Sequence, residues 1–175
     1  SEIWSFADAA TGAARAALAR PEASRMAILG YGEQAGTHAQ AISHVRKLEA
    51  LSVWGRDPAR AQAFATATEA KLGVPVTVAQ SVREAVAGAD IVTTVTNARE
   101  PILQGAWIAP GTHLNLVVSS GPGPSEVDND LVVRSRFIAD SREGVLAQGA
   151  EFLYAKAAGL IGDDHVVGEI GQVLG

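Results

Sequence analysis

A short glycine-containing segment constrains the fold of this chain more than any other feature. Residues 26–35 read Met-Ala-Ile-Leu-Gly-Tyr-Gly-Glu-Gln-Ala, an apolar run that ends in Gly-x-Gly-x-x-Ala before a helix-forming segment. This order predicts a strand, a tight turn and a helix, as in dinucleotide-binding βαβ units. Gly30 permits the turn, Gly32 leaves room for a pyrophosphate, and Ala35 allows the helix to pack closely on the strand. The alternative is a turn that binds no ligand.

Apolar and helix-forming segments alternate along the chain, and the strands read as continuous apolar runs, which is typical of a parallel sheet covered on both faces. We therefore expect an α/β fold, namely a doubly wound parallel sheet in three αβα layers, the NAD(P)-binding Rossmann fold. Its expected strand order is 3-2-1-4-5-6, with the ligand across strands 1 and 4. The expected strands are Arg25–Leu29, Ala50–Trp54, Val76–Ala79, Ile91–Val95, Thr112–Val117 and Arg136–Ala139. The expected helices include Ser5–Ala19, Gln34–Lys47 and Pro58–Leu72, and a further helix capped by Ser81 and Glu84.

Composition limits the partners of the chain. Its 175 residues, 47% of them hydrophobic, suffice for one core, so we expect residues 1–175 to form a single dinucleotide-binding domain. A net charge of −5 gives no reason to expect binding to nucleic acid or an anionic membrane. The lack of cysteine, of a membrane-length apolar run and of a signal-peptide pattern favours a cytoplasmic location. The histidines lack metal-ligand spacing, so we expect no metal site.

The residues after the second expected strand indicate which dinucleotide is bound. An NAD site usually has an acid at this strand end to bind the ribose 2′-OH, but Trp54 stands there and Arg56 follows. A guanidinium suits a 2′-phosphate, with Arg60 and Trp54 as neighbours that add charge and stacking. We therefore expect NADP. The alternative is NAD, with Arg56 a solvated loop residue and Asp57 either a helix cap or the ribose ligand.

Further candidate cofactor-binding residues lie in the glycine turn and at the ends of the fourth and fifth expected strands, where the carboxyl edge of the sheet would carry the ligand. Together with Gly30, Gly32, Ala35, Trp54 and Arg56, these are Tyr31, Glu33, Gln34, Thr94, Val95, Thr96, Asn97, Val117 and Ser119.

Several segments together resemble the ornithine cyclodeaminase/mu-crystallin family. The glycine turn matches its G-x-G-x-Q-A-x-x-H pattern, and residues 111–128 resemble its N-x-V-G-x-x-x-P-x-x-x-E-L-D segment, with Val118 at its glycine position. The resembling segments are Leu29–His38, Ala89–Thr96, Gly111–Asp128, Asp140–Glu143 and Val167–Val173. The resemblance implies hydride transfer between a nicotinamide and the α-carbon of an amino acid or imino acid.

The chain departs from the family pattern at two places. Members of the family have a second domain that carries substrate-binding Arg and Lys residues and forms a dimer interface; we expect it to be absent from this chain. Phe6 aligns near one such Arg. Ser120 stands where cyclodeaminases carry an Asp, which makes Ser120 the candidate catalytic residue, as a hydrogen-bond donor, or else a structural serine in a Gly/Pro turn.

These observations lead to one main functional prediction and two alternatives. The main prediction is the cofactor domain of an NAD(P)-dependent oxidoreductase acting on an amino acid or cyclic imino acid, a homodimer if a longer chain supplies the second domain. The first alternative is a cyclodeaminase-type lyase that uses bound NAD, which Ser120 disfavours because a lyase needs an acid–base group near the amine. The second is a non-catalytic NADPH-binding module. We expect no turnover from this chain alone, because the substrate would lack its positioning groups.

Overall fold

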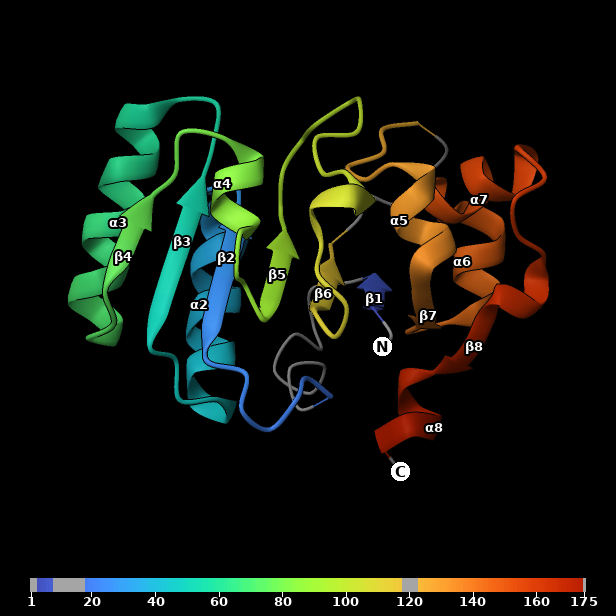
Figure 1. Ribbon diagram of the computed structural model, residues 1–175, viewed down its shortest axis with the longest axis horizontal. Helices are drawn as coiled ribbons and strands as arrows, with labels where there is room; N and C mark the ends of the chain where they lie inside the picture. The colour runs from blue at the N-terminus through green and yellow to red at the C-terminus, as the bar shows by residue number, and fades with distance from the viewer. Residues whose placement is uncertain (1–2, 8–17, 118–122, 175) are drawn as a thin grey trace.

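The computed structural model describes residues 3–7, 18–117 and 123–174, and all strand pairs in it are parallel. Eight strands of these described residues form one sheet in the order β4-β3-β2-β5-β6-β1-β7-β8 (Figure 1). The strands are β1 (Ile3–Ala7), β2 (Arg25–Leu29), β3 (Ala50–Trp54), β4 (Val76–Val78), β5 (Ile91–Thr94), β6 (His113–Leu116), β7 (Ser135–Ala139) and β8 (Val166–Glu169).

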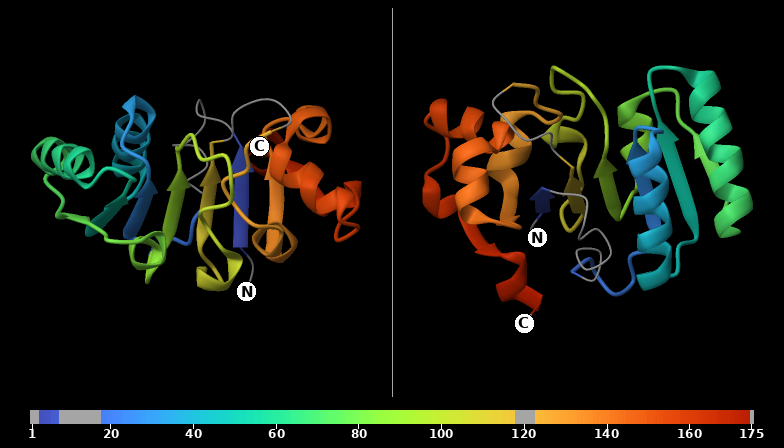
Figure 2. Two further views of the ribbon diagram at one scale, coloured as in Figure 1. Left: turned by 90° about the horizontal axis from the view of Figure 1, so that it is seen from above. Right: turned by 180° about the vertical axis from the view of Figure 1, so that it is seen from behind.

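Helices cover both faces of the sheet, so the expected three-layer αβα arrangement is confirmed (Figure 2). The helices are α2 (Glu33–Val45), α3 (Pro58–Leu72), α4 (Val82–Val86), α5 (Asn129–Arg134), α6 (Arg142–Gln148), α7 (Ala150–Ala157) and α8 (Ile170–Leu174). Two short 3₁₀ helices are η2 (Gly105–Trp107) and η3 (Asp163–His165).

The apolar run of β2 divides its side chains between two cores because successive side chains of a strand point to opposite faces. Met26 and Ile28 pack in one buried cluster with residues of α2 and α3. Ala27 and Leu29 pack in the other, with residues of α4, α5 and α7. All four side chains are at most 1% exposed, which explains why this strand lacks a polar alternation.

The caps of two helices follow the predicted pattern. The Asp57 carboxylate accepts hydrogen bonds from the backbone N–H groups of Ala59 and Arg60, with Pro58 in the first turn of α3. At α4, the Ser81 hydroxyl accepts from the Glu84 N–H at 3.1 Å, and the Glu84 carboxylate accepts from the Gln80 N–H at 2.8 Å. These bonds satisfy N–H groups that have no partner within the helix.

The order of five strands is confirmed, but the prediction for the remainder was wrong. The expected order 3-2-1-4-5 corresponds to β4-β3-β2-β5-β6. β1 then lies between β6 and β7, which were expected to be neighbours, and β8 extends the sheet beyond β7.

The prediction of a helix over Ser5–Ala19 was wrong at its start, because Ser5–Ala7 belong to β1. The sequence Ile3-Trp4-Ser5-Phe6 favours a strand, since β-branched and aromatic residues fit a pleated surface, and pairing on both sides stabilises it. Phe6 pairs with Asn115 in the ladder between β1 and β6. Residues 8–17 of the expected helix lie outside the described residues.

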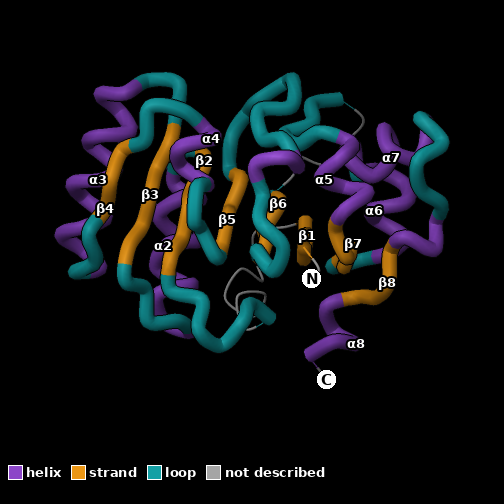
Figure 3. The backbone as a smooth tube through the Cα atoms, in the orientation of Figure 1, coloured by secondary structure: helices purple, strands orange, loops and turns teal. Residues whose placement is uncertain are grey.

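The carboxyl ends of β2, β3 and β5 meet at one edge of the sheet. The Gly30 N–H donates to the Trp54 carbonyl at 2.8 Å, and the Val95 N–H donates to the Leu29 carbonyl at 2.8 Å. Figure 3 shows the loop that follows β5 extending beyond this edge before the chain turns back toward η2. The edge therefore brings together three loops that are far apart in the sequence.

Candidate functional site

The two glycines of the turn after β2 meet different requirements. Gly30 has φ +121°, a conformation that side chains disfavour, and a Cβ there would lie 2.5 Å from the Val95 carbonyl oxygen. Gly32 is the N-cap of α2 with extended backbone, and a Cβ there would meet no protein atom within 4 Å. The fold therefore needs glycine at position 30. At position 32 the glycine instead keeps open the space in front of a helix N-terminus, which suits a phosphate group.

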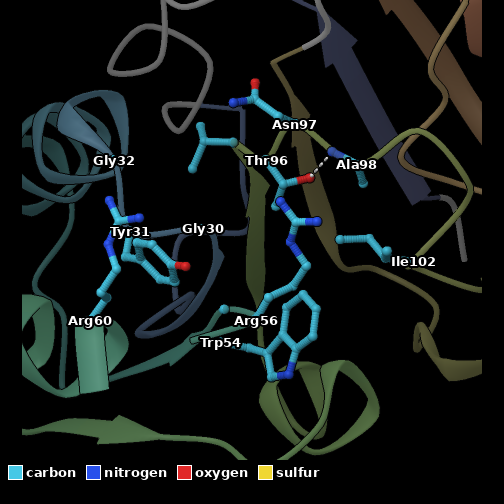
Figure 4. Close-up of a pocket in the computed structure, with 12 residues that line it drawn as sticks. Gly30, Tyr31, Gly32, Trp54, Arg56, Arg60, Thr96, Asn97, Ala98 and Ile102 are labelled. Carbon is cyan, nitrogen blue, oxygen red and sulfur yellow. Dashed lines mark hydrogen bonds between the residues drawn. The ribbon is translucent and has the colours of Figure 1, made fainter. Parts of the chain in front are cut away.

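A cavity of about 220 Å³ lies beside this turn (Figure 4). The turn after β2, the connection between β3 and α3 and the loop after β5 all contribute residues to it. The lining residues are Gly30, Tyr31, Gly32, Trp54, Gly55, Arg56, Arg60, Val95, Thr96, Asn97, Ala98 and Ile102. Eight of them, from Gly30 to Asn97, are candidate cofactor residues predicted from the sequence.

One wall of the cavity, which we call the β3 wall, consists of Trp54, Gly55, Arg56 and Arg60. Arg56 is exposed, and neither it nor Arg60 forms an ion pair with another described residue. The Arg60 guanidinium lies 4.9 Å from the centroid of the Tyr31 ring, a cation–π contact. The β3 wall thus presents two cationic groups and one aromatic ring to the cavity, with the Tyr31 ring of the neighbouring turn beside Arg60.

The Asp57 carboxylate accepts hydrogen bonds from the first turn of α3. Its Oδ1 accepts from the Ala59 N–H at 2.9 Å and from the Arg60 N–H at 3.1 Å, so the carboxylate serves as the cap of α3. This geometry favours the interpretation of Asp57 as a helix cap over its alternative as a ribose ligand.

The opposite wall, which we call the β5 wall, consists of residues 95–98. Glu126 holds this wall through hydrogen bonds. Its carboxylate accepts from the Thr96 N–H at 2.7 Å and from the Thr96 hydroxyl. The same carboxylate accepts from the Thr94 hydroxyl at 2.8 Å. The Ala98 N–H in turn donates to the Thr96 hydroxyl oxygen at 3.1 Å. These bonds connect the loop to a segment thirty residues further along the chain.

Two buried carboxyl groups lie behind the β5 wall. Glu126 is 4% exposed and Glu151, in the first turn of α7, is 3% exposed. Burial raises the pKa of Glu126, while its hydrogen bonds from Thr96 and Thr94 oppose that shift. Burial likewise raises the pKa of Glu151, and the nearby charge of Glu126 raises it further. The Glu126 N–H donates to the Glu151 carboxyl at 3.2 Å, which joins the two residues directly.

The remaining predicted residues lie outside the cavity lining. Glu33 and Gln34 are exposed in the first turn of α2, and Ala35 is buried against the sheet, as its predicted packing role requires. Thr94 is buried and bonded to Glu126. Val117 is half-buried and donates its N–H to the Thr94 carbonyl at 3.1 Å. Ser119 and the candidate catalytic Ser120 lie outside the described residues.

The sequence interpretation missed several residues of this site. Gly55, Ala98 and Ile102 line the cavity but are small or apolar and carry no chemical signal. Glu126 lies within the family-like segment Gly111–Asp128, but its position in the sequence indicates no role for it. Within the described residues, no group of three or more His, Asp or Glu side chains could hold a metal ion, and no helix has the length and hydropathy of a membrane span.

Comparison with known proteins identifies the family. A model of the ornithine cyclodeaminase/mu-crystallin family matches residues 6–175. The chain belongs to this family. Ketimine reductase mu-crystallin of Rattus norvegicus is 35% identical over 157 residues, which cover 90% of this chain and 47% of the relative. The resemblance deduced from the sequence motifs is therefore confirmed.

Solved structures of the family agree with the fold. The Δ1-pyrroline-2-carboxylate reductase of Thermococcus litoralis, solved in complex with NADH and L-proline, matches with a TM-score of 0.90 and 35% identity; the match covers 94% of this chain and 51% of that one. The iminosuccinate reductase of Paracoccus denitrificans, in complex with NAD⁺, matches with a TM-score of 0.85 and 28% identity over 94% of this chain and 50% of that one. The chain thus spans about half the length of the relatives that it matches.

Proposed function

We propose that this chain is the NADP-binding part of a reductase that converts an imino acid into an amino acid. The support is twofold. The chain is similar to ketimine reductase mu-crystallin and to Δ1-pyrroline-2-carboxylate reductases, whose names state this reaction class. The cavity at the carboxyl edge of the sheet also has the features that a dinucleotide requires, including an open helix N-terminus at Gly32.

Different parts of the cavity would bind different parts of the dinucleotide. The Gly30–Gly32 turn and the N-terminus of α2 would hold the pyrophosphate, the β3 wall would hold the adenosine end, and the β5 wall would hold the nicotinamide end. When bound, the cofactor supplies the hydride that reduces the C=N bond. The protein orients the nicotinamide relative to the substrate, because correct orientation of hydride donor and acceptor lowers the barrier to hydride transfer by several kcal/mol.

The observation that carries the choice of NADP is Arg56. Its guanidinium is exposed at the cavity and free of ion pairs with described residues, Arg60 lies nearby, and Asp57 is engaged as a helix cap. A 2′-phosphate gains charge-assisted hydrogen bonds here, whereas none of the described residues that line the cavity is an acid that would bind a 2′-OH. NAD remains the alternative cofactor, since the related structures from Thermococcus litoralis and Paracoccus denitrificans contain NADH and NAD⁺.

The substrate side of the reaction depends on residues outside the cavity. We infer a small amino or imino acid as substrate, with Ser120 as a hydrogen-bonding residue near it. Serine instead of an acid at this position supports the reductase over a cyclodeaminase-type lyase. We further infer a cytoplasmic location, and a homodimer if a longer chain supplies the second domain. The acidic net charge supports the absence of nucleic-acid and membrane partners.

Titration of the chain with NADPH and NADH, followed by calorimetry or tryptophan fluorescence, tests the cofactor assignment. We expect saturable binding with a preference for NADPH, and no binding at millimolar ligand would reject the proposal. The reaction class is tested with the full-length protein. A reductase oxidises NADPH with pyrroline-2-carboxylate, whereas a lyase releases ammonia from ornithine without net consumption of cofactor. An NADPH-binding protein with neither activity would support the non-catalytic module.

A further inference from the structure

The loop after β5, which lines the cavity, is hydrogen-bonded to a buried side chain, Glu126. Thr96 is bonded twice to Glu126, through its N–H and its hydroxyl, and its hydroxyl oxygen also accepts from the Ala98 N–H. Thr96 and Ala98 both line the cavity, whereas Glu126 does not. The carboxylate therefore acts on the shape of the cavity from outside it.

The groups around Glu126 favour a side chain that only accepts hydrogen bonds. Three hydrogens point at the two carboxylate oxygens: one backbone N–H and two hydroxyl groups, of Thr94 and Thr96. An ionised carboxylate accepts all three, and such charge-assisted bonds are about twice as strong as neutral ones. A protonated carboxyl must donate through one oxygen, so at least one of these bonds is lost or reversed.

The groups that face Glu126 show which carboxyl of the buried pair holds a proton first. β5 and its loop offer only threonine groups to it, and α7 offers Glu151. Within the described part of its own segment, Asp128 is occupied with the N–H groups of Gly105 and Leu131. Glu151 accepts from backbone N–H groups alone, and the charge of Glu126 raises its pKa. With two threonine hydroxyls and one N–H bonded to it, Glu126 is favoured over Glu151 as the first carboxyl of the pair to ionise.

We propose that Glu126, as a carboxylate, is a positioning residue for the dinucleotide that holds residues 94–98 in the shape that receives the nicotinamide end. The proposal rests on the proposed binding of NADP. Because protonation of Glu126 would break or reverse at least one bond to Thr94 or Thr96, cofactor affinity should depend on the charge of a residue that does not line the cavity.

The test compares NADP⁺ affinity of the parent chain and of Glu126→Gln across a range of pH. The amide keeps the size of the side chain and removes its charge. We expect the dissociation constant of Glu126→Gln to exceed that of the parent about tenfold at pH 8, because neutral bonds replace charge-assisted ones. The ratio should fall toward one as the pH drops through the raised pKa of Glu126. Taking the ratio cancels the ionisation of the ligand and of groups common to both proteins.

Glu69→Gln is the matched control, since Glu69 also accepts from a backbone N–H, that of Val76 at 2.9 Å, but lies on α3 away from the cavity. Its ratio should stay at one throughout. A ratio for Glu126→Gln that is constant across pH would overturn the inference, because a purely structural contact acts independently of charge. A constant ratio with NADP⁺ bound would overturn only the role of Glu126. If the parent binds no NADP⁺ at any pH, the proposed binding of NADP fails too.

A second pair of variants keeps the test decisive if Glu126→Gln does not fold. Thr96→Val removes one donor from the carboxylate and should move the midpoint of the parent's affinity–pH profile to higher pH, because fewer hydrogen bonds then stabilise the charged form. Thr96→Ser retains the hydroxyl and should restore the parent midpoint. Equal midpoints in all three proteins would contradict the role of Glu126.

Discussion

The β3 wall and the β5 wall face the same cavity, but their polar groups are satisfied in different ways. Arg56, at the β3 wall, is exposed and makes no ion pair within the described residues. Thr96, at the β5 wall, has both its N–H and its hydroxyl bonded to a buried carboxylate. Arg56 at the first wall therefore gains an ionic partner only when a ligand binds, whereas Thr96 at the second wall is held in place by the protein itself.

This difference predicts two kinds of sensitivity. Interactions of an exposed guanidinium with a phosphate are screened by salt, with a Debye length of about 10 Å at 0.1 M. Interactions around a buried carboxylate are screened little but respond to pH, because burial places the pKa of Glu126 above its ordinary value. Salt should therefore report on the β3 wall and pH on the β5 wall.

The largest expected effect comes from Gly30, which joins the turn to the β5 wall. In Gly30→Ala, the methyl group would meet the Val95 carbonyl oxygen in a backbone conformation with φ +121°. Strain and overpacking together should lower the free energy of unfolding by about 3 kcal/mol, as measured by urea denaturation. Gly88→Ala is the control, since Gly88 also has positive φ but its Cβ would meet nothing within 4 Å. Equal losses in the two variants would show that the contact with Val95 is unimportant.

The next largest effect is expected at Gly32, between the two walls. Valine there should abolish NADPH binding, a loss of more than about 100-fold, because the side chain fills the space of the pyrophosphate. The free energy of unfolding should fall by only about 1 kcal/mol, the cost of a poor N-cap residue. Calorimetric titration and urea denaturation of the same sample separate the two effects. If Gly32→Val still binds NADPH, the pyrophosphate does not bind at this turn.

Arg56→Ala tests the β3 wall alone. We expect NADPH affinity to fall about 10- to 100-fold, the value of a charge-assisted bond, while NADH affinity stays nearly unchanged. The parent's preference for NADPH should shrink as the salt concentration rises. Arg83→Ala, which removes another exposed arginine that does not line the cavity, is the control. Equal weakening of both cofactors by Arg56→Ala would mean that Arg56 does not recognise the 2′-phosphate and would favour NAD.

The sequence predicted most lining residues of both walls but not the carboxylate that supports the β5 wall, for a physical reason. The features of the β3 wall are local: Trp54, Arg56 and Asp57 follow one strand directly, and their roles depend on neighbours within a few residues. Glu126 acts on Thr96 across thirty residues, and only the pairing of its segment with Leu103 brings the two together. No local pattern marks such a contact.

The same distinction explains the errors in the fold. The five strands β4-β3-β2-β5-β6 alternate with helices and follow from the βαβ pattern, including their order. β1 precedes that pattern, and its partners β6 and β7 lie more than a hundred residues further along the chain. Helix-forming alanines directly follow β1, so a local interpretation extends the helix into the strand.

The smallest expected effect concerns the stability of the buried pair behind the β5 wall. The pKa of Glu151 is raised in the folded protein, so the folded state binds more protons than the unfolded state between the two pKa values. Stability from this group is therefore fully present below the unfolded pKa of about 4.5 and is lost as the pH rises through the folded pKa.

Glu151→Gln removes the titration and keeps an oxygen that can accept from the Glu126 N–H. We expect the variant to match the parent near pH 4.5 and to be more stable at pH 8, where a gain of about 1 kcal/mol would raise the Tm by about 2–4 °C. A Tm difference that does not change with pH would mean that Glu151 has the same protonation state in the folded and unfolded chain. Glu151 would then make no contribution to the pH dependence of stability.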